Sequence, residues 1–206
     1  MRLACLVSSV LVVVAAESLR VGAQAELQTH IGHILDSYKD TPKQQGLLPT
    51  ALDEAKIAAE HAALALKSRD NLDQMKLHAA HVINAIDPTI EPKGPGLGYG
   101  VKKAAQGVQQ HVELAAKIDG ASTTAKNQAL YVSRWAANVV KWSDEAIELA
   151  QEIRKTTSAS AAGGAATELV TMTEQLISGM PAVGRFDPQG GLKQAQERME
   201  LMKKGP

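Results

Sequence analysis

The sequence predicts an all-α protein, folded as an up-down helical bundle. Helix-forming Ala, Leu, Lys, Glu and Gln dominate the 206 residues, and runs of β-branched residues are few. Apolar residues recur at steps of three and four, the spacing that gives a helix one buried face.

Seven helices are expected, each bounded by capping or helix-breaking residues. Pro49 suits a first helical position and Ser122 suits an N-cap, because the first N–H groups of a helix have no partner within it. The breaks are expected at Asp87-Pro88, the glycine-rich segment Glu91–Gly100, the small-residue linker Thr156–Ala166 and the loop Met180–Gly191. The predicted helices are Glu26–Lys39, Pro49–Ser68, Asp70–Ile86, Gly100–Ile118, Ser122–Arg154, Ala165–Ser178 and Leu192–Lys203.

An internal repeat at an offset of about fifty residues predicts how these helices pair. Gly46–Lys67 aligns with Gly96–Lys117, and the alignment pairs His61 with His111. We therefore expect two αα-hairpins, about residues 46–87 and 96–154, as a four-helix core. An N-terminal helix and C-terminal helices at 165–204 would complete a single domain, residues 26–206.

The N-terminus has the pattern of an export signal. Arg2 precedes an apolar stretch of about fourteen residues, and Ala23-Gln24-Ala25 suits a signal peptidase. Residues 1–25 are therefore predicted to be a signal peptide, with cleavage after Ala16 as an alternative, and the protein is expected to be periplasmic or secreted. The apolar stretch is shorter than the roughly twenty residues that a membrane span needs, so no membrane span is expected.

Charge and cysteine content limit the chemistry. The chain has 22 basic and 22 acidic residues and 3% aromatic residues, which argues against a nucleic-acid surface, since that surface needs clustered positive charge and stacking rings. The single cysteine, Cys5, would be removed with the signal peptide. A metal ion would then have to be held by His, Met, carboxylate or backbone groups.

The histidine spacing predicts a metal site on the first hairpin. If the chain folds back near Arg69, His61 lies eight residues before the turn and His78 nine after it, so both lie roughly 12 to 13 Å from the turn. His81 follows one helical turn after His78, on the same face. These imidazoles could share one ion; alternatively, they line a polar groove or face solvent.

Groups near this site could complete its coordination. Glu60, Asp73 or water would supply a fourth ligand, and Met75 lies three residues before His78. A thioether beside imidazole favours Cu(I), whereas imidazole alone suits Cu(II), nickel or zinc. Copper is our first expectation, and Met75 is as readily explained as core packing.

Three further histidines are second-rank candidates. His30 and His33 repeat the three-residue spacing on the first helix, and they could join the hairpin histidines in one multinuclear cluster or form a free surface pair. His111 stands in the second hairpin, where Gln128 and Tyr131 occupy the places of His78 and His81. The metal capacity is therefore expected to concentrate in the first half of the chain.

The stretch EAKIAAEHAALALKSRDNLDQMKLHAAHV, Glu54 to Val82, resembles the small metal-binding protein family of bacterial periplasms. Members of that family carry repeated histidine-alanine patterns on the helical hairpins of a four-helix bundle and bind divalent copper and similar ions. The resemblance implies a role in metal buffering, delivery as a chaperone, or storage.

Two other functions are also compatible with the sequence. A non-covalent haem bundle would clamp iron between histidines, or a histidine and a methionine, of two helices. A ligand-free structural module would instead present the helices at 122–154 and 192–203 to an unknown protein partner. Enzyme activity is not expected, because no nucleophile, base and orienting group can be assembled from the sequence.

Overall fold

The computed structural model describes residues 21–181 and 189–204, and these form helices joined by loops. The all-α prediction is confirmed. The elements are the N-terminal helix (residues 21–35), the short 3-10 helix η1 (Pro42–Gln44), α2 (Leu47–Lys67), α3 (Leu72–Ile86), α4 (Val101–Lys117), α5 (Thr123–Lys155), α6 (Ala159–Ser178) and α7 (Leu192–Lys204). Residues 1–20 of the predicted signal peptide lie outside the described part, while residues 21–25 form the first turn of the N-terminal helix.

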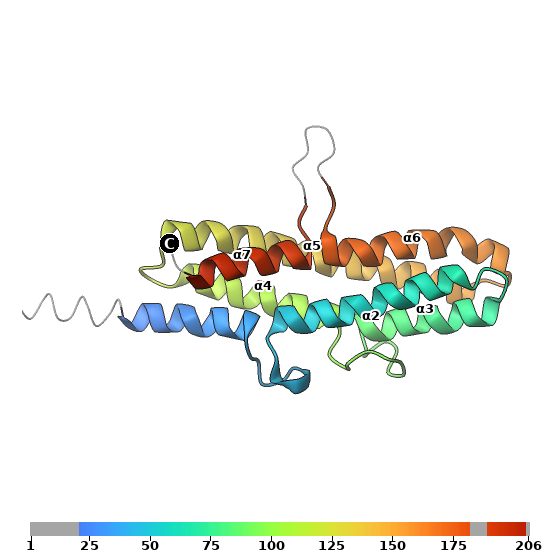
Figure 1. The fold of residues 1–206 in the computed structure, drawn as a ribbon, viewed down its shortest axis with the longest axis horizontal. Helices are drawn as coiled ribbons and strands as arrows, with labels where there is room; N and C mark the ends of the chain where they lie inside the picture. Colours follow the sequence, from blue (N-terminus) through green and yellow to red (C-terminus); the bar gives the residue numbers. More distant parts are fainter. Residues whose placement is uncertain (1–20, 182–188, 205–206) are drawn as a thin grey trace, which may run out of the picture.

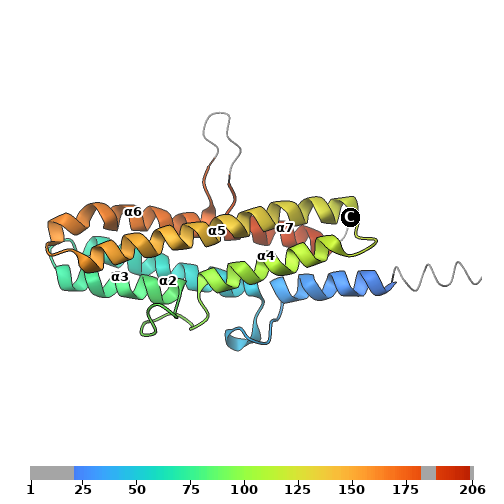
Figure 2. The ribbon, with the colours of Figure 1, turned by 180° about the vertical axis from the view of Figure 1, so that it is seen from behind.

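The helices lie along one axis of an elongated molecule (Figure 1). The N-terminal helix and α2 follow each other along this axis, α3 and α4 run back along it, and α5 spans most of the length (Figures 1 and 2). The loops at residues 36–46 and 87–100 project from the same side near the middle of the molecule. One end therefore contains α2, α3 and α6, and the other contains the N-terminal helix, α4 and α7.

As predicted, α2 packs against α3 and α4 packs against α5. The turns that join the two pairs, however, lie at opposite ends of the molecule (Figure 1). The reason is the glycine-rich segment before α4, which carries the chain onward from α3 instead of turning it back. The repeated positions His61 and His111 consequently lie in opposite halves of the molecule.

A buried carboxylate fixes this glycine-rich segment. The Glu54 side chain, on α2, is fully buried and accepts hydrogen bonds from the backbone N–H groups of Leu97 at 2.9 Å, Tyr99 at 3.0 Å and Gly100 at 2.9 Å. Gly100 is the N-cap of α4, so Glu54 also places negative charge at the positive end of that helix. The segment forms a turn, as expected, and three of its backbone amides bind the Glu54 side chain.

The expected linker at Thr156–Ala166 is wrong, because α6 begins at Ala159. The Ser158 side chain caps the helix by accepting from the N–H of Ala161 at 3.2 Å. Ala162, Ala165 and Ala166 are buried against the core, which offsets the low helix propensity of the adjacent glycines. The first predicted helix also ends earlier than expected, at residue 35.

One continuous apolar core runs through the molecule, and small residues line much of it. On α2 the alanines face the core at steps of three and four, so neighbouring helices approach closely. These fully buried positions are Ala51, Ala55, Ala58, Ala62 and Ala65. Trp135 and Trp142 are also buried, as expected for a core stripe. Within the described residues, no helix has both the length and the apolar character needed to cross a membrane.

Candidate metal centres

The predicted hairpin site brings its three histidines together. His61 comes from α2 and His78 and His81 come from α3, which starts at the Asn71 cap just after the turn. Their Nδ1 atoms lie 3.0 Å apart for His61 and His78 and 3.4 Å apart for His61 and His81. One ligand atom from each ring lies within 4.8 Å of the others. We name these residues the hairpin triad.

These distances suit a shared ion. Two nitrogens bound to one ion at about 2.0 to 2.1 Å are roughly 2.9 Å apart at a right angle and roughly 3.4 Å apart at a tetrahedral angle. The same distances also suit hydrogen bonds between neutral imidazoles, in which one ring donates and the other accepts. The three rings are half-buried, so solvent or a further ligand can reach the centre.

The surroundings of His61 and His78 favour their neutral forms. Burial lowers the pKa of His61, as do the nearby His81 and His78, while Glu60 raises it. Burial and His81 also lower the pKa of His78. A ring nitrogen can bind a metal only through its free lone pair, so a lowered pKa increases the fraction of the ligand-competent form at neutral pH.

A second group of three histidines lies in the other half of the molecule. His30 and His33 come from the N-terminal helix and His111 from α4, and their ligand atoms also lie within 4.8 Å of one another. The Nδ1 atoms of His30 and His111 are 2.9 Å apart. We name these residues the bridging triad, because they join segments 81 residues apart in the chain.

The bridging triad is covered by an aromatic ring and contains an unsatisfied nitrogen. The ring centroid of Tyr38 lies 5.4 Å from those of His33 and His111. The Nδ1 atom of His33 is buried and has no hydrogen-bond partner. Burial, His33 and His30 lower the pKa of His111 to about 4, and burial and His33 lower that of His30, against a raising effect of Glu26. The neutral, ligand-competent forms of His30 and His111 are therefore favoured here as well.

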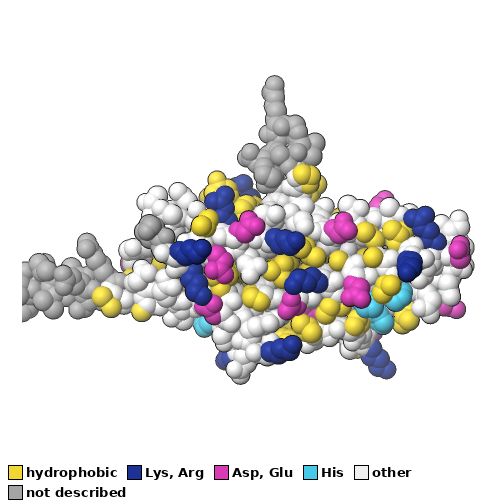
Figure 3. All heavy atoms as spheres, in the orientation of Figure 1, with side chains coloured by type: hydrophobic (Ala, Val, Ile, Leu, Met, Phe, Trp, Pro, Cys, Tyr) yellow, Lys and Arg dark blue, Asp and Glu magenta, His cyan; other side chains and the backbone are white. Residues whose placement is uncertain are grey.

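The expectation of one multinuclear cluster is wrong, and so is that of a free surface pair at His30 and His33. Leu47, at the start of α2, packs against Gly107, one turn before His111. His61 lies fourteen residues further along α2, about 21 Å from Leu47 at 1.5 Å per residue. Histidine side chains accordingly gather at two separate places on one face of the molecule (Figure 3).

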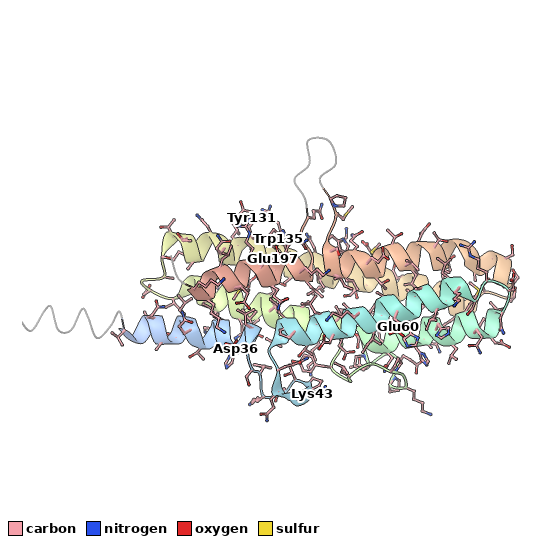
Figure 4. All side chains as sticks on the ribbon, viewed as in Figure 1. Asp36, Lys43, Glu60, Tyr131, Trp135 and Glu197 are labelled. Carbon is pink, nitrogen blue, oxygen red and sulfur yellow. The ribbon has the colours of Figure 1, made fainter. Side chains whose placement is uncertain are left out.

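The sequence indicated that His111 has no histidine partners in the second hairpin, but the structure gives it two from elsewhere in the chain. Its partners come from the N-terminal helix, while Gln128 and Tyr131 on α5 interact with α7. The Arg198 guanidinium donates to Gln128 Oε1 at 3.1 Å and lies 5.2 Å from the Tyr131 ring centroid. In Figure 4, Tyr131 and Trp135 of α5 lie near Glu197 of α7, where α5 and α7 pack against each other.

A signal for the bridging triad was present in the sequence. Each triad combines one histidine at the repeated position, His61 or His111, with a pair spaced by three residues on a neighbouring helix. By analogy with α2 and α3, the repeat alone indicated that the histidine partners of His111 would lie on α5, the helix that follows α4. Recognising the N-terminal helix as that source requires knowing that α3 and α4 continue in one direction.

Other expected ligands lie outside both triads. Met75 is fully buried in the core, which agrees with its packing interpretation. Glu60 and Asp73 are exposed and do not belong to the group of ligand atoms within 4.8 Å of one another.

Comparisons of the chain with protein-family models, with curated proteins and with solved structures find no match.

Proposed function

We propose that the protein binds a transition-metal ion through His61, His78 and His81, as a metal buffer, chaperone or storage protein. One observation carries the proposal: the three ligand atoms, from two antiparallel helices, lie within 4.8 Å of one another. Half-buried rings leave coordination positions open, which favours an ion that is taken up and released over a closed structural site.

The donor set favours Cu(II), nickel or zinc, and copper remains our first choice. All three donors are imidazole nitrogens, which suit these borderline ions. The buried Met75 does not support a thioether ligand for Cu(I).

The geometry favours a bare ion over haem at this site. A haem held by two of these histidines would need room for its macrocycle between two axial nitrogens. The Nδ1 atoms of His61 and His78 are only 3.0 Å apart. A Soret band in the purified protein would contradict this choice.

We propose that the helices form one up-down bundle of four columns: the N-terminal helix with α2, α3 with α4, α5, and α6 with α7. This arrangement is supported by the way consecutive helices share the long axis (Figure 1). We also propose that the protein is exported, and N-terminal sequencing of the periplasmic or secreted form should then give Glu26.

Titration of Cu(II) or Ni(II) into variants tests the metal site. His78→Gln with His81→Gln removes two ligands of the hairpin triad, so its tight binding should be lost while circular dichroism at 222 nm is retained. The matched control, His30→Gln with His33→Gln, removes the same number of imidazoles at the same spacing and should leave the hairpin triad loaded. Equal binding by wild type and the His78/His81 variant would refute the proposed site.

A further inference from the structure

We propose that a metal ion in the bridging triad fastens the N-terminal helix to α4, so that metal occupancy controls the docking of this helix. The inference rests on the proposed binding of transition metals by these imidazole clusters, and it assigns a distinct role to the second one. The ion would take two ligands, His30 and His33, from the helix that docks and one, His111, from the helix that receives it.

The two helices differ in how firmly the rest of the molecule holds them. α4 is enclosed by packing against α2 and α5, and its N-terminus is held by the buried Glu54 carboxylate. The N-terminal helix is joined to α2 by the loop at residues 36–46. Its buried apolar contacts come from four residues, Leu27, Ile31, Ile34 and Leu35.

The bridging triad also has a polar atom that needs a partner. His33 Nδ1 is buried without a hydrogen bond, although a buried polar group is ordinarily paired. Docking of the helix therefore leaves a lone pair or an N–H group unsatisfied at the triad. Small rotations of the three rings would direct their nitrogens at one ion, and the Tyr38 ring would cover it.

The hairpin triad provides the contrast. Its helices are linked by residues 68–71 alone and pack along their length, so its ligands lie close together whether or not an ion is present. An ion there would stabilise an arrangement that already exists. At the bridging triad, an ion that binds only the docked helix shifts the docking equilibrium by a factor of 1 + [M]/Kd, about 100-fold at a free concentration of 100 Kd.

Hydrogen exchange of residues 26–35, measured with and without Zn(II), tests the inference. Zn(II) should raise the protection of this segment by about 100-fold at 100 Kd in wild type. The same increase is expected in the His78→Gln/His81→Gln variant, because its bridging triad is intact. His111→Gln should abolish the increase while it still binds one Zn(II) at the hairpin triad.

The outcomes separate this inference from the proposed function. Two bound Zn(II) per chain with unchanged exchange at residues 26–35 would overturn the fastening role and leave metal binding intact. No bound Zn(II) in any variant would overturn both. His30→Gln/His33→Gln removes the ligands from the other helix and should reproduce the effect of His111→Gln; an increase in protection that persists in either variant contradicts the inference.

Discussion

Removing the Glu54 carboxylate should destabilise the protein more than any other single charge change on α2. In Glu54→Ala, the N–H groups of Leu97, Tyr99 and Gly100 lose the acceptor that they share at 2.9 to 3.0 Å. A hydrogen bond to a charged group contributes about 1.5–3 kcal/mol, and a buried group left unsatisfied costs about 1–3 kcal/mol. Because the glycine-rich segment can partly relax toward water, we expect a total loss of about 3–5 kcal/mol in the free energy of unfolding.

Urea unfolding at pH 7 measures this loss as a shift of the midpoint at constant m value. Glu54→Gln should lose less, about 1–3 kcal/mol, because its amide oxygen still accepts while its NH₂ group faces one of the three donors. Asp53→Asn is the matched control: the Asp53 side chain is 45% exposed and paired with Lys56 on the same helix at 2.9 Å, so its loss should stay below about 1 kcal/mol. A loss below about 1 kcal/mol in Glu54→Ala would refute the role given to this carboxylate.

Two further predictions concern acid stability and backbone strain. Metal-free protein should lose stability as the pH falls from about 6.5 toward about 4, because His111 has a pKa of 6.5 in the unfolded chain and about 4 in the folded chain. Urea unfolding across this range should show that the stability of His111→Gln depends less on pH than that of wild type. An unchanged pH dependence would contradict the lowered pKa of His111. Gly98 and Gly100 share a φ of 87°, but a Cβ at Gly98 meets nothing within 4 Å whereas one at Gly100 would lie 2.7 Å from the Ile86 carbonyl oxygen. Gly98→Ala should therefore cost about 1 kcal/mol and Gly100→Ala roughly 2–4 kcal/mol in thermal or urea unfolding, and equal losses would argue against the close approach.

Local patterns predicted the helices well, because each pattern acts within a few residues. The Ser122 side chain does cap α5 by accepting from the N–H of Ala125 at 3.1 Å, and His61, His78 and His81 meet because a four-residue turn fixes the register of α2 and α3. Composition was misleading at Thr156–Ala166, where burial of alanines outweighs the glycines.

The bridging triad could not be derived from the repeat, because it depends on long-range direction. A buried glutamate and a glycine-rich segment decide whether α4 turns back along α3 or continues past it. Once α4 continues, His111 faces the N-terminal helix. Sequence spacing within the second hairpin carries no information about that helix.

X-ray absorption spectroscopy of the Cu(II)- or Zn(II)-loaded protein tests the central claim most directly. In the variant with His30, His33 and His111 all changed to Gln, the only remaining histidines among the described residues are those of the hairpin triad. One ion per chain, with about three imidazole nitrogens at about 2.0–2.1 Å and the outer-shell scattering of their rings, is the expected result. An ion surrounded by oxygen alone, or by one imidazole, would contradict a metal centre built from His61, His78 and His81.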